Sequence, residues 1–226
     1  FALLKKLDNN SSLYANAAKS FKMPTFTQIY GGGGANFAAN PLLEPEEGWT
    51  YEFGYKKTSN TSMFKAALYY MDLDTIEYEG KGTSSNPYVT RNMSFKNKGL
   101  EMTYEKDFGS KYSYSLGANF CNPMGKNKKG VWERKFAREQ YNAGIKYHDA
   151  KFNAALTGMF TTDRASGWGD LLPVNFIAGY KFDKSSSVEL GVENIFDRDD
   201  IVSNPGSATK YYCLPRMVHV TYTYTF

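Results

Sequence analysis

Apolar and polar residues alternate along most of the chain. In residues 112–121, Tyr112, Leu116 and Phe120 fall on one face of an extended chain, and Ser113 falls on the other. The same alternation recurs in residues 152–161, 172–182 and 218–226. A period of two predicts β-strands, because successive side chains of a strand point to opposite faces. Most of these apolar faces carry an aromatic residue near one end.

Two kinds of connection separate the predicted strands. Short polar turns are expected at Asp8–Asn10, Thr58–Thr61, Asp107–Lys111, His148–Ala150 and Asp183–Ser186. Long irregular segments are expected at Lys22–Gly48, Gly80–Asn92, Asn122–Lys135, Asp163–Leu171 and Asp197–Pro215. Because short and long connections alternate, an up-and-down barrel would have all its tight turns at one rim, as outer-membrane barrels do. A soluble sandwich mixes the two kinds, and such a sandwich or a lipocalin-type barrel is the alternative.

The pattern predicts about eleven strands, of which the first covers Phe1–Leu7. An odd number would put the two ends of the chain at opposite rims, whereas single-chain bacterial barrels have an even number with both ends periplasmic. We therefore expect an all-β, antiparallel, up-and-down transmembrane barrel that is closed by strands outside this sequence. Closure is needed because an open edge in lipid leaves unpaired backbone groups, which are costly.

The composition is compatible with this fold. Aromatic residues make up 16% of the 226 residues, which favours strands over helices, and no run approaches the roughly 18 apolar residues of a spanning helix. A net charge of +4, scattered along the chain, gives no indication of nucleic-acid binding. The two cysteines, Cys121 and Cys213, have no metal-binding spacing, and both a disulfide and two free thiols are compatible with the sequence.

The segment Phe21–Gly48 stands out between two regular strands. It contains three prolines and the four glycines Gly31–Gly34, so neither strand nor helix is expected there. The glycines do not form a phosphate-binding loop, because no Lys-Ser/Thr pair and no helical pattern follow them. We expect a flexible external loop that can close over a ligand, with Tyr30 and Phe37 placed to stack on it.

Several motifs resemble TonB-dependent outer-membrane receptors, which import iron chelates, haem and cobalamin. The first motif runs from Leu13–Tyr14–Ala15 through Ser20–Phe21–Lys22–Met23–Pro24 and resembles one strand of that family. The second is Asn40–Pro41–Leu42–Leu43–Glu44–Pro45–Glu46, followed by Tyr51–Glu52–Phe53–Gly54–Tyr55. Two further strands of the family are similar to Gly99–Leu100–Glu101 and to Gly191–Val192–Glu193–Asn194–Ile195–Phe196–Asp197. The end of the chain, from Pro215–Arg216 to Phe226, resembles the closing strand of that family. The motifs follow the family's order and cover nearly all of the chain.

The resemblance implies a 22-stranded barrel with an internal plug, of which residues 1–226 would be the C-terminal half, about the last eleven strands. The plug and the N-terminal strands are absent from this chain. The implied partners are the TonB complex acting through that plug, the remaining strands from the same or a separate polypeptide, outer-membrane lipid, and a small metal chelate or cofactor as ligand. The implied location is the bacterial outer membrane, crossed many times.

The long segments hold the predicted ligand-binding residues, which are aromatic residues and arginines suited to anionic, aromatic or metal-chelate ligands. They are Tyr30, Phe37, Tyr88, Arg91, Trp132, Arg134, Trp168, Tyr211 and Tyr212. The alternative for each is a place in the aromatic girdle at the lipid headgroups. The polar wall of the barrel is predicted to contain Glu52, Lys56, Glu101, Glu105, Asn142, Lys146, Asn175, Lys181, Glu189 and Glu193.

Histidine positions argue against haem as the ligand. Haem receptors of this family usually carry a histidine between the two halves of the Phe-x-x-Pro…Asn-Pro-x-Leu segment, and here none lies between Pro24 and Asn40. The two histidines are His148 and His219, which leaves Tyr30 as the alternative iron ligand.

No catalytic constellation is expected, because neither histidine is predicted to reach a serine nucleophile. Two groups of acidic residues offer carboxylates but lack the spacing of a calcium loop. They are Asp72, Asp74, Glu77 and Glu79, and separately Asp197, Asp199 and Asp200. The chain is therefore predicted to be no enzyme and to carry no cofactor or metal site. The function expected is TonB-energised import of a scarce ligand, and the alternative is a non-gated porin-like channel or a structural barrel component.

Overall fold

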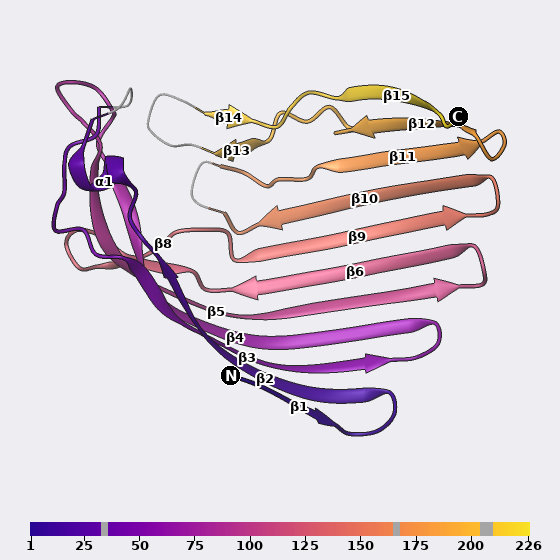
Figure 1. Cartoon of the computed structure of the whole chain (residues 1–226), viewed down its shortest axis with the longest axis horizontal. Helices are drawn as coiled ribbons and strands as arrows, with labels where there is room; N and C mark the ends of the chain where they lie inside the picture. The colour runs from indigo at the N-terminus through magenta and orange to yellow at the C-terminus, as the bar shows by residue number, and fades with distance from the viewer. Residues whose placement is uncertain (33–35, 165–167, 204–209) are drawn as a thin grey trace.

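The computed structural model describes residues 1–32, 36–164, 168–203 and 210–226. Eleven strands follow one another in a single antiparallel sheet, each paired with the next along the chain (Figure 1). They are β1 (Ala2–Lys6), β2 (Ser11–Lys22), β3 (Glu46–Thr58), β4 (Ser62–Glu79), β5 (Val89–Phe108), β6 (Tyr112–Cys121), β9 (Glu139–His148), β10 (Phe152–Thr162), β11 (Val174–Lys181), β12 (Ser186–Glu193) and β15 (Met217–Tyr224). The predicted up-and-down topology and the predicted strand number are confirmed.

The long segments contain more regular structure than the sequence suggested. A five-residue helix, α1 (Phe26–Tyr30), lies in the segment predicted to have neither strand nor helix, so that prediction was wrong. Thr25 and Gln28 form a capping box at its start, which satisfies free backbone groups of this short helix. Four short strands also occur in these segments: β7 (Met124–Lys126), β8 (Trp132–Arg134), β13 (Ile201–Ser203) and β14 (Tyr211–Tyr212). No helix in the described residues is long and apolar enough to cross a membrane.

All the tight turns lie at one end of the sheet and all the long segments at the other, as predicted (Figure 1). The hairpin of β4 and β5 is much longer than the others, with 18 and 20 residues in its strands. A tilted strand needs only about 9–11 residues to cross a bilayer. The far half of this hairpin therefore extends beyond the thickness of a membrane on the long-loop side.

Three of the five tight turns are held by the same local interaction. Asp8 Oδ1 accepts hydrogen bonds from the amides of Asn10 and Ser11, both at 2.7 Å. The same pattern links Asp149 to the amides of Lys151 and Phe152, and Asp183 to the amides of Ser185 and Ser186. Such Asx turns close a hairpin with a side chain instead of further backbone bonds.

These turns make the fold sensitive to acid. The backbone amide of Phe152 and the Tyr147 hydroxyl lower the pKa of Asp149 to about 2, below its value of about 3.9 in an unfolded chain. A lowered pKa contributes stability above pH 4 that is lost as the pH falls toward 2. We expect the Asp149→Asn variant, which keeps an acceptor but no charge, to lose less stability than the wild type between pH 5 and pH 2.5. Urea unfolding of the lipid-reconstituted protein measures this, and equal losses would contradict it.

One face of the sheet is apolar and lies open. Among the described residues only three hydrophobic ones, Leu43, Ala67 and Phe95, are buried. In contrast, Leu68, Leu116 and Val220 are 59%, 52% and 67% exposed on the apolar face. Aromatic rings contact one another near both ends of this face, in Trp49–Tyr51, Phe120–Tyr141, Tyr141–Phe160, Tyr112–Tyr147 and Tyr147–Phe152. An apolar band between two aromatic girdles is the outer surface of a membrane barrel.

The opposite face is polar. The strand register places all ten predicted wall residues on it, from Glu52 on β3 to Glu193 on β12. Large side chains of this face cover glycines of the next strand: the Tyr14 ring lies over Gly54, and the Tyr69 ring lies over Gly99. The Tyr14 hydroxyl also donates a 2.5 Å hydrogen bond to the Glu52 carboxylate. The polar face is thus closely packed across neighbouring strands.

Candidate ligand-binding site at the long-loop end

The first long segment is attached to the tip of the β4–β5 hairpin. Gln28 of α1 is buried, and its Nε2 donates a 2.5 Å hydrogen bond to the Tyr78 hydroxyl. The hydroxyl of Thr90, which is 1% exposed, donates to the Gln28 carbonyl at 3.3 Å. A single residue of α1 therefore contacts both strands of the hairpin and anchors the helix there.

The second half of this segment is fixed to the same hairpin. The amide of Ala38 donates to the Tyr88 carbonyl at 2.8 Å, and Asn40 Nδ2 donates to the Thr90 carbonyl at 2.7 Å. The Asn92 side chain accepts from the amide of Glu44 and donates to its carbonyl, each at 2.9 Å. The described part of the predicted flexible loop is thus a docked loop with defined partners, whereas Gly33 and Gly34 lie outside the described residues.

Two of the predicted aromatic residues come together here. The Phe37 ring lies 5.3 Å from that of Tyr88 and 5.7 Å from that of Tyr78, measured between ring centroids. Tyr30 lies apart from them, because it packs on Phe26 of its own helix at 4.5 Å and is mostly exposed. The structure therefore joins Phe37 and Tyr88 in one cluster and leaves Tyr30 on the surface of the loop.

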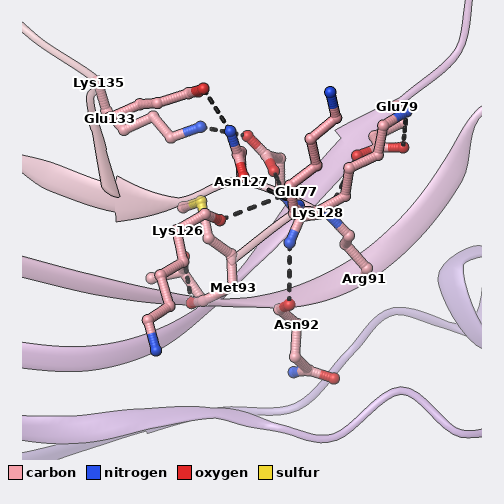
Figure 2. Close-up of polar contacts among 12 residues, drawn as sticks. Glu77, Glu79, Arg91, Asn92, Met93, Lys126, Asn127, Lys128, Glu133 and Lys135 are labelled. Carbon is pink, nitrogen blue, oxygen red and sulfur yellow. Dashed lines mark hydrogen bonds and ion pairs between the residues drawn. The ribbon is translucent and has the colours of Figure 1, made fainter. Parts of the chain in front are cut away.

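Arg91 is the centre of an ion-pair network (Figure 2). Its guanidinium binds the carboxylates of Glu77 and Glu79, the latter at 3.1 Å, and donates to the Lys126 carbonyl at 3.3 Å. Lys135 pairs with Glu77 at 2.6 Å, and Lys128 adds a 3.6 Å contact with Glu79. Glu77, Arg91 and Lys135 are only about a quarter exposed or less. The network links the β7–β8 hairpin to the tip of β4 and β5.

Trp132 and Arg134 lie in the β7–β8 hairpin but have different surroundings. The Trp132 ring is flanked by the ammonium groups of Lys96 and Lys126, at 5.7 and 5.4 Å from its centroid. Arg134 binds the Asp163 carboxylate and the carbonyls of Asp163 and Arg164. Arg134 therefore links this hairpin to the segment after β10.

The remaining predicted residues, Trp168, Tyr211 and Tyr212, lie in the last two long segments of the chain. The Arg164 guanidinium lies 5.1 Å from the Trp168 ring and donates to the Val202 carbonyl of β13 at 3.5 Å. Tyr211 and Tyr212 form β14, which pairs with β13, and both are at least half exposed. The predicted residues are thus spread over the long-loop end: the Phe37 and Tyr88 rings are in contact, Arg91 binds the β7–β8 hairpin, and Tyr30 lies apart from both.

The structure gives a role to two residues that were not predicted to belong to the site. Asn194 is buried and its amide donates to the carbonyls of Arg198 and Leu214, both at 2.8 Å. Asp200 binds the Arg198 guanidinium and the amide of Leu172, and the hydrogen bond from Arg198 lowers the pKa of Asp200. These side chains fix the segment between β12 and β15 from both of its ends.

Other candidate chemistry finds no support in the described part of the chain. No group of three or more His, Cys, Asp or Glu side chains there can hold a metal ion. Neither His148 nor His219 forms a hydrogen bond with a serine or an acidic side chain there, and His219 lies over Gly191 on the polar face. Cys121 and Cys213 are free thiols.

An eleven-stranded antiparallel wall with a bare apolar face, a polar face and elaborate loops at one end defines the class of outer-membrane β-barrels. A family model described as "TonB dependent receptor-like, beta-barrel" matches residues 2–195. The chain belongs to this family. Members of the family are outer-membrane transporters and not enzymes, in agreement with the sequence-based prediction.

Solved structures with the same fold include a copper transporter, OprC, with a TM-score of 0.78 at 14% identity. The ferric-catecholate import receptor Fiu from K12 E. coli gives a TM-score of 0.72 at 19% identity, and the ferric enterobactin receptor PfeA from Pseudomonas aeruginosa gives 0.75 at 18%. Each match covers 100% of this chain but only 39%, 34% and 39% of the three structures. The chain therefore spans little more than a third of the length of these proteins.

Proposed function

We propose that the chain is the C-terminal half of a 22-stranded, plugged barrel in the bacterial outer membrane. Its family membership supports this proposal, as do its eleven wall strands, which are half of that number. The plug and the other strands belong to a part of the receptor outside this sequence. In this arrangement the apolar face meets lipid and the polar face lines the interior.

The receptor binds a scarce ligand outside the cell and imports it with energy relayed by the TonB complex to the plug. The family resemblance implies a ferric siderophore, haem or cobalamin as the ligand. Of these, a negatively charged ferric chelate fits the charge of the long-loop end best. Residues 122–138 contain six basic residues and one acidic residue, and this basic segment lies beside the Arg91 network at the long-loop end. Ferric-catecholate and ferric citrate receptors are among the proteins of similar fold.

The observation that carries the proposal is the match of the barrel family to residues 2–195. The absence of a histidine between Pro24 and Asn40 in the sequence argues against haem. The polar wall residues supply hydrogen-bonding groups along the path that the ligand takes once the plug moves.

The test is uptake by cells that lack the gene for this chain and by cells in which it has been restored. We expect cells that lack the gene to lose uptake of a radiolabelled ferric catecholate or citrate, and cells with the restored gene to regain it. We also expect wild-type cells to lose this uptake when TonB is removed or the proton gradient is collapsed. Uptake that persists without TonB, together with a steady ion conductance of the purified protein in bilayers, would instead identify a non-gated channel. Uptake of cobalamin alone would overturn the ferric ligand class.

A further inference from the structure

Two hollows lie on the apolar outer face of β5 and its neighbouring strands. The larger has a volume of about 480 Å³ and its lining is almost wholly apolar. It exists because small residues lie close together here: Ala143 of β9 is opposite Gly158 of β10, and Ala118 of β6 lies diagonally across from Ala143. Met102, Tyr104 and Phe160 rise around them. The result is a groove in the surface that faces the hydrocarbon of a bilayer.

The second hollow lies toward the long-loop end of the same strand. It has a volume of about 220 Å³ and is lined by Lys96, Lys98, Trp132, Tyr70, Asn122 and Met124. The register places Lys96, Lys98 and Met102 on one face of β5. Lys98 is four residues from Met102, which at about 3.4 Å per residue is about 14 Å. For a strand tilted by about 45° this is about 10 Å along the membrane normal, and one leaflet of the hydrocarbon core is about 15 Å thick. The lysines therefore lie near the headgroups when the groove lies in the outer leaflet.

Positive charge dominates the upper hollow. Lys96 shares its charge with Asp72 at 3.2 Å, and the Tyr70 hydroxyl donates to the same carboxylate at 3.3 Å. Lys98 is exposed and has no ion pair among the described residues, and the Lys126 ammonium lies 5.4 Å from the Trp132 ring centroid. Two lysines therefore line the hollow and a third contacts its tryptophan, whereas Asp72 is the carboxylate that pairs with one of them. Tryptophan with lysine at this depth is typical of headgroup contacts.

We propose that these two hollows form one binding site for a phosphorylated lipid of the outer leaflet. The phosphate binds Lys96 and Lys98 beside Trp132, and one acyl chain passes over Leu100 into the groove at Ala118, Ala143 and Gly158. The lysines carry the charge that a phosphate needs, and the groove is continuous with the surface that faces lipid. We therefore infer a lipid and not a protein segment, because an apolar groove inside a bilayer is filled by acyl chains. The inference rests on the proposed membrane location.

Native mass spectrometry of the whole receptor, extracted in mild detergent and titrated with purified lipid A, tests the site. We expect Lys96→Ala/Lys98→Ala to weaken lipid A binding about tenfold or more, because each surface lysine contributes to attraction of an anionic headgroup. Ala143→Leu, which fills the exposed groove, is expected to weaken binding of lipid A without altering the charge. Lys19→Ala, a lysine near the long-loop end of β2 that pairs with Glu47, is the matched control and is expected to bind as the wild type does.

Equal lipid A binding by the wild type and both groove and lysine variants would overturn the proposed site. Equal binding of lipid A and of its dephosphorylated form would overturn the role of the phosphate. A wrong membrane location can be told apart from a wrong lipid site. If the location is wrong, the receptor is missing from the outer-membrane fraction before any lipid is added.

Discussion

Replacing Arg91 by alanine is expected to weaken ligand binding about tenfold and to make the β7–β8 hairpin sensitive to protease. The change leaves Glu77 and Glu79 without the guanidinium that joins them, and it removes the contact with the Lys126 carbonyl. Removing one partner of a fully buried pair costs roughly 3–5 kcal/mol. Because these side chains are about a quarter exposed, or somewhat more for Glu79, we expect about 1–3 kcal/mol, which corresponds to a range from about fivefold to about a hundredfold.

Two measurements separate the effect on the β7–β8 hairpin from the effect on ligand binding. Trypsin cleavage after Lys126, Lys128 and Lys129 in intact cells reports on the hairpin without any ligand, and the dissociation constant of a labelled ferric chelate reports on the site. Arg91→Lys is expected to be intermediate, because one ammonium group cannot reproduce the planar fork that contacts both carboxylates. Lys65→Ala is the control, because it removes a lysine of the polar wall that has a 3.9 Å contact with Glu52 and lies 5.6 Å from the Tyr14 ring centroid, and that contacts no part of the Arg91 network. Unchanged cleavage in Arg91→Ala would show that the network does not hold the hairpin.

Replacing Gly99 by alanine is expected to impair assembly of the barrel. A Cβ atom at Gly99 would collide with the phenol of Tyr69 and with the carbonyl oxygen of Phe120 on the next strand. The backbone carbonyl belongs to the β5–β6 ladder, so relief requires a shift of the strands. Overpacking of this kind costs about 1–3 kcal/mol.

Gly117→Ala is a close control, since Gly117 lies on the same polar face one strand away. The nearest atom to a Cβ at that position is Asn142 Nδ2 at 3.5 Å, an ordinary contact. We expect the amount of folded, heat-modifiable protein in the outer membrane to fall for Gly99→Ala and to stay normal for Gly117→Ala. Equal amounts of the two variants would refute the steric explanation.

The strand pattern was predictable because it depends on local alternation. The faces of β6 and β10, the strict order of short and long connections, and the polar wall all follow from residue spacing and agree with the register. The positions of the short turns were predictable from their polar residues, whereas the aspartate hydrogen bonds that close three of them are seen only in the structure. Each of these features involves residues that are neighbours in the sequence or on adjacent strands.

The candidate site was less predictable because its contacts join distant segments. Gln28 and Tyr78 are 50 residues apart, and Glu77 and Lys135 are 58 apart. Glu77 and Glu79 lack the spacing of a calcium loop in the sequence, but that spacing did not indicate their partners, which the structure shows to be cationic side chains. One local signal for α1 was present, namely the Thr25-x-x-Gln28 capping box. The contacts of that helix with Tyr78 and Thr90 could not be derived from spacing.

The tight turns have a consequence for how the protein folds. Each wall strand from β2 to β12 pairs with the wall strand before it and the wall strand after it, and three of the tight turns are closed by an aspartate within a few residues. The loop that must close to join two such strands is short, so its entropic cost is small. Hairpins can therefore form one by one and be added to the growing wall in chain order. An error in one turn then affects its own pair of strands before it affects the rest of the barrel.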